Sequence, residues 1–566
     1  MKIPYGISNF KKLVTEGYYF VDKTKYIEIL ENMPEQYNMY LRPRRFGKSL
    51  FISMLSYYYD IKERENFNNL FSKFYISKKP TQNANSYMIL QFDFSGIDTR
   101  NFDSTYNGFR EKVLNSVGLF MSRCFKDKFN SKFETIKAPD KIFDKFINLV
   151  QANTDNKIFV LIDEYNHFAN EILAFTPKEF EIIFAANGFV RKFYEELKTA
   201  TRIGVVDRIF ITGVTSLALY SLTSGFNIAA NLSRNLELYE MIGFNDDEIK
   251  SIIDQICLNV DCDKTQLYND LQDYYNGYLL SPEAKQRIFN SDMILYFAKE
   301  FLRNNGRYPN IMLDMNILSD YGKIKQIFKI GDYSQNLVQL DKLVVDGYVT
   351  GGIKDHLNYA SFGRDDFINI LFYMGLITIQ SAMGVRYRFC IPNLVIENLY
   401  REFFIDVITN RLDLSYDASK LLDAMDKMAF EGDISDFINI VQNILETFSN
   451  RDFQKFNEKY IKAIILSILA FYRGFIPKSE YEVETGHIDI FIKRNHQFPD
   501  IKYSFLLELK YLHKAEGKAI ARIEQQAIKQ LKRHMSTHEL EKVKDLKKYI
   551  IIFWGKYLKV IKEVDG

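Results

Sequence analysis

The sequence predicts an α/β protein with more than one domain. The apolar segments Met88–Phe94, Lys157–Ile162 and Arg208–Thr212 have the length and composition of buried strands, and a helical pattern near Glu179–Leu197 lies between the last two. Buried strands that alternate with helices indicate a parallel sheet covered on both faces. Because 566 residues are too many for one hydrophobic core, we expect roughly two to four domains.

The composition is that of an ordinary globular protein, with 47% hydrophobic and 26% charged residues. The net charge of +2 does not by itself indicate a nucleic-acid-binding protein, although a basic surface need only line the groove that meets phosphates. Between Lys510 and Lys548 basic residues outnumber acids but the signs are mixed, so a DNA-facing surface and an ordinary solvated surface both stay open. The aromatic residues, 15% of the chain, are expected to fill cores.

No feature of the sequence indicates secretion or a membrane. The N-terminus, MKIPYGISNF, lacks the apolar core of a signal peptide, and the most apolar stretch, Ala463–Tyr472, is about half a membrane span. Cys124, Cys257, Cys262 and Cys390 have no partners at zinc-finger spacing, so we expect buried thiols in a reducing compartment. These observations predict a cytoplasmic protein.

A phosphate-binding loop is predicted between a short extended segment, Gln36–Leu41, and a helical pattern, Leu50–Tyr59. The motif at this place is Arg42-Pro-Arg-Arg-Phe-Gly-Lys-Ser49. Such a loop directs backbone N–H groups and a helix N-terminus at phosphate oxygens, while its Lys reaches the terminal phosphates and its Ser hydroxyl binds Mg²⁺. Arg42 replaces the first glycine of the full pattern, and Pro43 removes one N–H donor.

A second element strengthens the prediction of an ATP or GTP site. A buried-strand pattern ends in Asp163 and Glu164, which beside the loop would hold Mg²⁺ through water and polarise the attacking water, respectively. A further strand ends at Thr212, where AAA-type ATPases place a polar sensor of the γ-phosphate; that match is weak because Thr is common in strands. The candidate nucleotide-binding residues are Arg44, Arg45, Phe46, Gly47, Lys48, Ser49, Leu50, Asp163 and Thr212.

The C-terminal region carries acidic residues in places where they need partners. Glu458 lies on a strongly apolar predicted helix, Asn457–Tyr472, and shares a face with isoleucines. A carboxylate on such a face is costly without a partner or a metal ion. Asp489 stands between two isoleucines in a strand pattern, Tyr481–Ile492.

A Glu-x-Lys pair follows on the next predicted strand, Ser504–Leu512. Because side chains alternate along a strand, Glu508 and Lys510 point to the same face. A helical pattern, Lys518–His534, and an apolar strand, Tyr549–Trp554, come after them. Helix, strand with Asp, strand with Glu-x-Lys, helix, strand is the order of a metal-dependent nuclease core.

The chemistry of phosphodiester hydrolysis accounts for these residue types. A hard cation on the scissile phosphate requires oxygen ligands, which Asp489 and Glu508 can supply together with the Leu509 carbonyl. The cation acts as a Lewis acid and lowers the pKa of a bound water. Lys510 would orient that water or help to deprotonate it, and its ammonium would stabilise the charge on the phosphoryl oxygens. Glu458 could complete the metal shell. Glu-x-Lys can also be a solubility device of an edge strand, but the apolar flanks disfavour an edge here.

The middle of the chain is predicted to be largely helical. Helical patterns run from about Asp246 to Leu318, after a cap at Asn245. Between Phe362 and Asn393 a helix precedes two short strand patterns, which indicates either a winged-helix unit or, as we favour, a structural spacer. The expected domains are 1–245, ATPase-like; 246–330, a helical lid or linker; 331–450, the spacer; and 451–566, nuclease-like.

Seven motifs resemble those of one known family, and they occur nearly from end to end of the chain. They are Tyr18-Tyr-Phe-Val-Asp-Lys-Thr24, Arg42-Pro-Arg-Arg-Phe-Gly-Lys-Ser49, Leu161-Ile-Asp-Glu-Tyr165, Ile211-Thr-Gly-Val214, Leu222-Thr-Ser-Gly-Phe-Asn227, Tyr275-Asn-Gly-Tyr278 and Glu508-Leu-Lys510. The chain thereby resembles bacterial and lower-eukaryotic proteins with an AAA-ATPase-like P-loop domain and a C-terminal PD-(D/E)XK nuclease domain. In that family the first glycine of the loop is typically replaced, as it is here.

The resemblance implies the functional residues of both domains. It implies ATP binding at Gly47, Lys48, Ser49, Asp163 and Glu164. It implies a nuclease centre at Glu458, Asp489, Glu508 and Lys510, and Gln530 fills the place of a helical Gln found after the Glu-x-Lys strand. The family usually reads DEYD where this chain has Asn166, a departure that bears on hydrolysis or on a structural ion pair.

Two functions from different classes compete. The first is an ATP-regulated, Mg²⁺-dependent nuclease, for which we favour DNA as the substrate while RNA stays open. The second is a nucleotide-dependent switch whose nuclease fold only binds nucleic acid or a protein partner. Homo-oligomers and a role in defence or transposition stay open, and none of Arg191, Arg202 and Arg234 is favoured as an arginine finger.

Overall fold

The computed structural model describes residues 1–126, 133–166, 168, 182–183, 187–216, 226–314, 324–355, 357, 362–412, 418–447, 457–513, 519–535, 537, 540 and 543–564. The chain forms two compact units. The first consists of Met1–Leu337 and Val349–Val395, and the second of Val338–Tyr348 and Ile396–Gly566. Each unit contains one of the two candidate sites and is described by itself.

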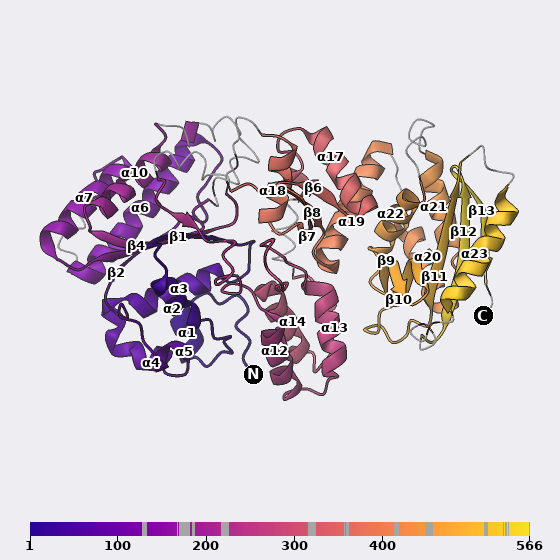
Figure 1. Ribbon diagram of the computed structural model, residues 1–566, viewed down its shortest axis with the longest axis horizontal. Coiled ribbons are helices and arrows are strands. Elements are labelled where there is room, and N and C mark those ends of the chain that lie inside the picture. The colour runs from indigo at the N-terminus through magenta and orange to yellow at the C-terminus, as the bar shows by residue number, and fades with distance from the viewer. Residues whose placement is uncertain are drawn as a thin grey trace. The chain divides into compact units, whose positions relative to one another are not determined.

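A five-stranded parallel sheet lies at the centre of the first unit (Figure 1). In spatial order its strands are β2 (Met88–Asp93), β3 (Ile158–Asp163), β4 (Val206–Gly213), β1 (Tyr37–Leu41) and β5 (Ala230–Asn231). Every residue of β3 is buried, as expected for a strand covered on both faces. The predicted parallel sheet is confirmed, and β1, β3 and β4 end at the same edge.

Helices cover both faces of this sheet (Figure 1). One face carries α3 (Lys48–Tyr59), and the other carries α6 (Phe102–Phe125), α7 (Pro139–Asn153) and α10 (Phe189–Arg202). The helix expected near residues 179–197 corresponds to α10, which begins after Gly188; residues 179–181 and 184–186 lie outside the described part of the chain. The doubly covered sheet has the P-loop NTPase arrangement that the sequence predicts.

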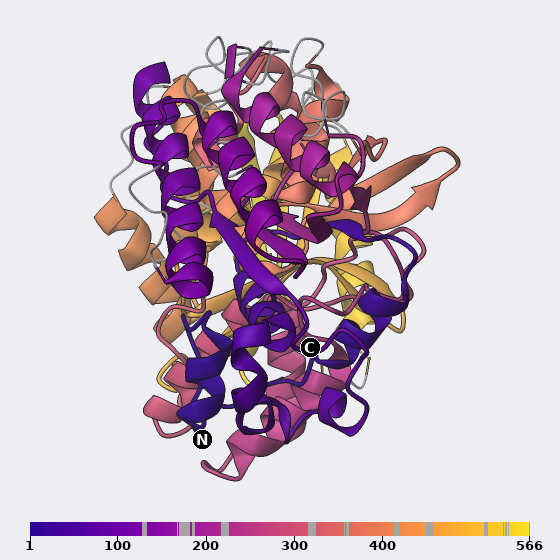
Figure 2. The ribbon, with the colours of Figure 1, turned by 90° about the vertical axis from the view of Figure 1, so that its left-hand side faces the viewer.

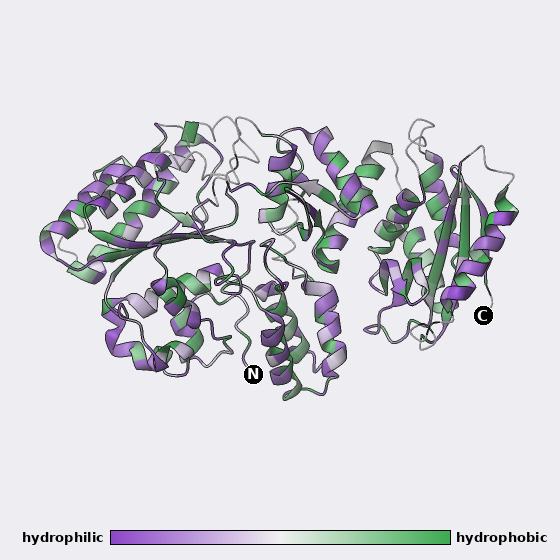
Figure 3. Ribbon diagram, in the orientation of Figure 1, coloured by the Kyte–Doolittle hydropathy of each residue, from purple (hydrophilic) through white to green (hydrophobic). Residues whose placement is uncertain are grey.

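Hydrophobic residues dominate the strands of this sheet, whereas the helices beside it carry hydrophobic and hydrophilic residues alike (Figure 3). Next to β2, the rings of Phe94 and Phe109 stack with their centroids 4.7 Å apart, and Phe193 of α10 packs edge-on against Phe92 at 5.3 Å. Such contacts add to the free energy of burying the rings themselves. The abundant aromatic residues of this unit therefore fill its core, as predicted.

The segment after the sheet is helical, again as predicted. α12 (Asp246–Cys257) begins with a capping box in which Asn245 and Glu248 each bond the other's backbone. α13 (Lys264–Tyr275) and α14 (Ser291–Arg303) follow. Shorter helices lie before and after these elements, namely α1 (Phe10–Thr15), α2 (Lys25–Asn32), α4 (Phe67–Phe71), α5 (Tyr75–Lys78), α16 (Ile324–Ile327) and α17 (Tyr333–Asp341).

The expectation of four thiols is wrong for one pair. Cys257 and Cys262 form a disulfide, because the chain folds back after α12 and brings their Cα atoms to 5.6 Å, a separation that a disulfide can span. Cys124 and Cys390 take no part in this disulfide and are half-buried. The sequence spacing indicated that the first two are near neighbours but not that they are bonded.

A small antiparallel sheet is formed by one strand before α18 (Arg364–Tyr373) and two strands after it. Its strands are β6 (Val349–Gly351), β7 (Thr378–Met383) and β8 (Arg386–Cys390), in the order β6-β8-β7. The helix and the two strands after it were predicted, whereas β6 was not. The β7–β8 hairpin extends away from the helices beside it, as Figure 2 shows.

The second unit is built on a five-stranded mixed sheet. In spatial order its strands are β13 (Tyr557–Glu563), β12 (Leu546–Trp554), β11 (Ser504–Leu512), β10 (Gly486–Arg494) and β9 (Phe475–Val483). β11 and β12 are parallel, and the other neighbours are antiparallel. Its main helices are α19 (Leu394–Leu412), α20 (Ala418–Glu431), α21 (Ser435–Thr447), α22 (Glu458–Leu469) and α23 (Ile520–Met535).

One strand prediction in this unit is wrong. The segment Tyr481–Ile492 is not one strand, because the chain turns at Glu484 and Thr485 and forms the β9–β10 hairpin. Gly486 has a φ of 137°, in the region that favours glycine, which allows the turn. Asp489 still lies on a strand, and β11 is central in the sheet, so Glu-x-Lys does not stand at an edge.

Candidate functional sites

The phosphate-binding motif forms a tight loop between β1 and α3. Gly47 precedes α3 with a φ of 103°, a conformation in which a side chain would be strained. Lys48, the first residue of α3, is buried, and its ammonium donates to the carbonyl oxygens of Arg42 and Pro43 at 3.2 and 3.1 Å. Its Nζ also lies 3.6 Å from Oε1 of Glu164. The loop lysine and the predicted catalytic carboxylate therefore face each other.

Arg42 is buried beneath the loop, which accounts for the missing first glycine. Its guanidinium donates to the carbonyl oxygens of Leu41, Ser233 and Tyr239 and lies over the Tyr40 ring, 4.4 Å from the centroid. Arginine suits this place because its donors form a planar fork that also stacks on aromatic rings. The side chain ties the loop to the segment after β5.

Asp163 lies at the end of β3 between the loop and β4. The Thr212 hydroxyl donates to its Oδ1 at 2.6 Å, and the Ser49 side chain also hydrogen-bonds to it. Burial raises the pKa of Asp163, which these two hydrogen bonds partly oppose. Glu164 follows with a φ of 49°, uncommon for a residue other than glycine. Thr212 is thus placed to orient Asp163.

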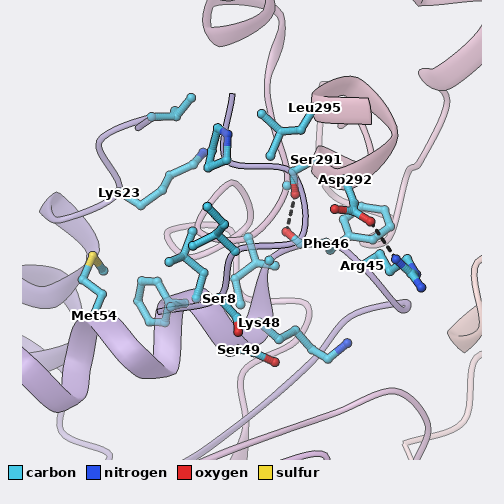
Figure 4. Close-up of a pocket in the computed structure, with 18 of the residues that line it drawn as sticks. Ser8, Lys23, Arg45, Phe46, Lys48, Ser49, Met54, Ser291, Asp292 and Leu295 are labelled. Carbon is cyan, nitrogen blue, oxygen red and sulfur yellow. Dashed lines mark hydrogen bonds and ion pairs between the residues drawn. The ribbon is translucent and has the colours of Figure 1, made fainter. Parts of the chain in front are cut away.

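A cavity of about 430 Å³ opens over the loop (Figure 4), a size typical of sites for small ligands. Glu164 and the predicted residues Arg44, Arg45, Phe46, Gly47, Lys48, Ser49 and Leu50 line it, whereas Asp163 and Thr212 lie behind its wall. The other lining residues were not predicted from the sequence, and they include Ile7, Tyr19, Phe20, Lys23, Met241, Phe244, Ser291 and Asp292. They are far from the loop in sequence, and only the Tyr18–Thr24 motif pointed to any of them.

Asn166 is part of the scaffold behind the cavity. It is fully buried, and its amide donates to the carbonyl and hydroxyl oxygens of Thr215 at 2.5 and 2.8 Å. Its Oδ1 accepts the backbone N–H of Val214 at 3.2 Å. An aspartate could not donate these bonds without a proton. This chain has Asn166 where the family that it resembles usually has Asp. The hydrogen bonds that the Asn166 amide donates join the ends of β3 and β4, and a carboxylate could not donate them.

The structure brings four of the predicted nuclease residues together in the second unit. Glu458 is the first residue of α22, Asp489 lies on β10, and Glu508 and Lys510 lie on β11. Nζ of Lys510 is 2.7 Å from Oε1 of Glu508, 3.7 Å from Oδ2 of Asp489 and 4.0 Å from Oε2 of Glu458. Three carboxylates from three elements therefore converge on one ammonium group.

Burial and neighbouring charges shift the pKa values of the ionisable groups in this cluster. Glu508 is fully buried, and burial, followed by the nearby Asp489 carboxylate, raises its pKa to about 7. The same two causes raise the pKa of Glu458. Burial lowers the pKa of Lys510, but the surrounding carboxylates outweigh it and raise the pKa above its ordinary value. Oε2 of Glu508 is buried without a hydrogen-bond partner in the part of the chain that the structure describes.

Lys462 and Glu480 join the cluster and were missed from the sequence. Lys462 lies one turn after Glu458 on α22 with only 6% of its side chain exposed, 3.4 Å from Oδ1 of Asp489 and ion-paired with Glu480. Glu480 has a φ of 48° within β9, a conformation that strands rarely contain. The signal available from the sequence was a lysine on the face that carries Glu458.

The carboxylates of Asp489 and Glu508 suit a Mg²⁺ ion that keeps most of its water ligands. Among the residues that the structure describes, no group of three or more His, Cys, Asp or Glu side chains is arranged to hold a metal ion. Mg²⁺ usually takes one or two carboxylates and keeps several waters, which Asp489 and Glu508 can provide. The unpartnered Oε2 of buried Glu508 is the kind of oxygen that a hard cation would satisfy.

Gln530 does not join the cluster. It is exposed on α23, whose buried face carries Ala527, Leu531 and His534. His534 lies closer to the core of the unit, where its Nδ1 hydrogen-bonds the Thr485 hydroxyl at 2.9 Å. A role of Gln530 toward a bound substrate stays a prediction.

The arginines considered as fingers have local partners or are exposed. Arg191 pairs with Glu195 and Arg234 with Asp355, while Arg202 is exposed at the end of α10. None of the three lines the cavity over the loop.

No described helix has the length and apolar character that crossing a membrane requires.

Comparison with known proteins defines the class. Residues 4–223 match the family described as "Predicted AAA-ATPase", and residues 456–563 match the PD-(D/E)XK nuclease superfamily. The chain therefore carries an AAA-ATPase-like domain followed by a PD-(D/E)XK nuclease superfamily domain. This is the architecture that its motifs predict.

Two similar proteins add detail. The "Uncharacterized protein in vnfD 5'region" of Azotobacter chroococcum mcd 1 is 25% identical over 304 residues, which are 53% of this chain and 53% of that protein. The chain thus spans about half the length of this curated relative. The solved structure of the Walker-type ATPase paby2304 of Pyrococcus abyssi is 12% identical with a TM-score of 0.36, over 67% of this chain and 94% of that one.

Proposed function

We propose that this protein is an ATP-binding and ATP-hydrolysing, cytoplasmic nuclease that cleaves DNA phosphodiester bonds with Mg²⁺. The observation that carries the nuclease half is the convergence of Asp489, Glu508 and Lys510 at one point of β10 and β11. The cavity bounded by the phosphate-binding loop and Glu164 supports the ATPase half. The superfamily of the C-terminal domain favours nucleic acid as the substrate.

In the nuclease centre, Asp489 and Glu508 would hold Mg²⁺, which supplies a Lewis acid for the scissile phosphate. Lys510 has the position to orient the attacking water and to stabilise negative charge on the phosphoryl oxygens. The backbone N–H of Leu509 donates to Oδ2 of Asp489 at 2.9 Å, and Lys462 holds the other oxygen. These contacts fix the Asp489 carboxylate in one orientation.

In the ATPase site, Lys48 would exchange its contacts with loop carbonyls for the terminal phosphates. Glu164 lies beside Lys48 and lines the cavity, where it can accept a proton from an attacking water. Ser49 and Asp163 are hydrogen-bonded to each other at the place where Mg²⁺ would be held. The apolar part of the cavity, which includes Ile7 and Phe244, would take the base.

The test uses supercoiled plasmid, Mg²⁺ and the full chain, with and without ATP. We expect cleavage by the wild type and a loss of at least about a hundredfold in Lys510→Ala, because the positioned ammonium acts on the transition state. Lys502→Ala, which removes an exposed lysine of the same unit, is the matched control. Equal cleavage by Lys510→Ala and the wild type would refute the nuclease proposal.

One observation favours a second candidate, a nucleotide-dependent switch with an inactive nuclease fold. The Lys510 ammonium lies where three carboxylates meet. It can therefore offset part of their charge without a metal ion, so the nuclease fold can be stable without being active. Measurements of ATP hydrolysis and of plasmid cleavage distinguish the nuclease from the switch. ATP binding that is lost in Lys48→Ala, together with no ATP hydrolysis and no plasmid cleavage by the wild type, indicates the switch.

A further inference from the structure

Asn290, which caps α14, and the first two residues of that helix bind the backbone of the phosphate-binding loop. The Asn290 amide, the Asp292 N–H and the Ser291 hydroxyl donate to the carbonyl oxygens of residues 44, 45 and 46, at 3.2, 3.2 and 2.6 Å. These three consecutive residues lie far outside the matched ATPase domain, which ends at residue 223. A helix from the predicted lid segment therefore fixes the shape of the loop.

A side-chain ion pair accompanies these backbone contacts. Nη1 of Arg45 lies 3.0 Å from Oδ2 of Asp292, as Figure 4 shows. Both side chains line the cavity over the loop, and both are more than half buried. Arg45 has a φ of 65°, so the loop adopts an uncommon conformation at the residue that forms this pair.

A guanidinium recognises carboxylate and phosphate groups with the same planar fork of donors. The phosphates of a nucleotide bound beside Lys48 would therefore be drawn to Arg45, where Asp292 already lies. Asp292 also places a negative charge near those phosphates, in a partly buried site where charges are weakly screened. Both effects oppose binding of the terminal phosphates.

We propose that Asp292 is a positioning residue that sets how strongly the site prefers longer phosphate chains, by competing with the nucleotide for Arg45. This inference rests on the proposed ATP site. Nucleotide binding transfers Arg45 from Asp292 to phosphate and so removes one of the contacts between α14 and the loop. Occupancy of the loop is thereby transmitted to the helical segment that contains α14.

The inference is tested by calorimetric titration of the full chain with ATP, ADP and AMP in the presence of Mg²⁺. For Asp292→Asn we expect ATP to bind about fivefold more tightly, the scale of a partly exposed ion pair, with a smaller gain for ADP and none for AMP. Arg45→Gln should weaken ATP binding and reduce the preference for ATP over ADP. In the double variant Arg45→Gln/Asp292→Asn, the gain from Asp292→Asn should disappear.

Two controls separate this inference from the proposed function. Asp254→Asn removes an exposed carboxylate of α12 and should leave all three affinities unchanged. If Lys48→Ala abolishes ATP binding but Asp292→Asn does not tighten it, or tightens AMP equally, the inference is overturned while the ATP site stands. If wild type and Lys48→Ala both fail to bind ATP, the proposed function falls and the inference with it. Should Asp292→Asn not fold, an unchanged ATP-to-ADP preference in Arg45→Gln overturns the inference.

Discussion

Lys510 and Glu508, two residues apart on β11, form an ion pair of 2.7 Å in which the carboxylate is fully buried. Strand alternation places both side chains on one face, and α22 and β10 bring Glu458 and Asp489 to the same point. Carboxylates outnumber ammonium groups in this cluster, even when Lys462 is counted. The excess negative charge is what a divalent cation would balance.

The raised pKa of Glu508 predicts a pH-dependent stability of the metal-free protein. The folded state holds this proton more tightly than the unfolded chain, so the stabilisation is present at low pH and is lost as the pH rises from about 4.5 to about 7. The loss from this group is about 3 kcal/mol at most. We expect the free energy of unfolding in EDTA to fall less over this range in Glu508→Gln than in the wild type. Glu482→Gln, an exposed position on β9, should keep the wild-type slope.

Replacing Lys462 by Met should change metal binding and cleavage in opposite directions. Loss of a buried cation 3.4 Å from Asp489 makes the cluster more negative, so we expect Mn²⁺ to bind several-fold more tightly in calorimetric titration. Cleavage should fall, because Asp489 loses a contact that orients it. Lys462→Arg keeps the charge and should keep the wild-type affinity. Unchanged or weaker Mn²⁺ binding in Lys462→Met would contradict the placement of Lys462 in the centre.

Asn166→Asp should destabilise the N-terminal domain. A carboxylate at this buried position would face the carbonyl oxygen of Thr215 without a proton to donate. The expected cost is about 2 kcal/mol in the free energy of unfolding, measured by chemical denaturation. Asn153 also donates to a carbonyl oxygen, but it is exposed, so Asn153→Asp should cost less than about 1 kcal/mol. Equal effects at the two positions would argue against the buried amide network.

Restoring the first glycine of the loop motif should harm the protein. Arg42→Gly removes a buried guanidinium with several hydrogen bonds and its stacking on Tyr40. We expect a loss of about 3 kcal/mol or more, seen as a lower melting temperature, and no gain in ATP affinity. Arg44→Ala, at a residue that lines the cavity, should change nucleotide binding more than stability. If the Arg42→Gly variant were as stable as the wild type, Arg42 would not anchor the loop.

Local patterns predicted most of the fold because each has a physical period or signature. Continuous apolar runs indicated the parallel strands, the capping box marked the start of α12, and alternation placed Glu508 and Lys510 together. The turn at Glu484 and Thr485 was not predicted, because apolar residues lie on both sides of it and made the segment resemble one strand. β6 has only three residues, and β13 is an edge strand without a fully buried residue, so neither has the continuous apolar run that indicates a buried strand.

The sites were predicted where function depends on neighbours in sequence. The loop motif and the Glu-x-Lys pair are local, so their residues could be named. Glu480, Asn290, Ser291 and Asp292 reach the sites through tertiary packing, and no spacing in one sequence indicates such contacts. Lys462 differs, because its place four residues after Glu458 on the same helix was an available signal. The roles of Gln530 and Thr212 stay predictions, since the first is exposed and the second lies behind Asp163.

We propose that the carboxylate cluster on β10 and β11 hydrolyses phosphodiester bonds with a divalent ion. The most direct measurement is the rate of plasmid cleavage in Mg²⁺ by the wild type, Glu508→Gln and Glu482→Gln. We predict a fall of about a thousandfold in Glu508→Gln, because a metal ligand is lost, and a rate within about twofold of the wild type in the control. Cleavage by Glu508→Gln at the wild-type rate would show that this cluster is not the nuclease centre.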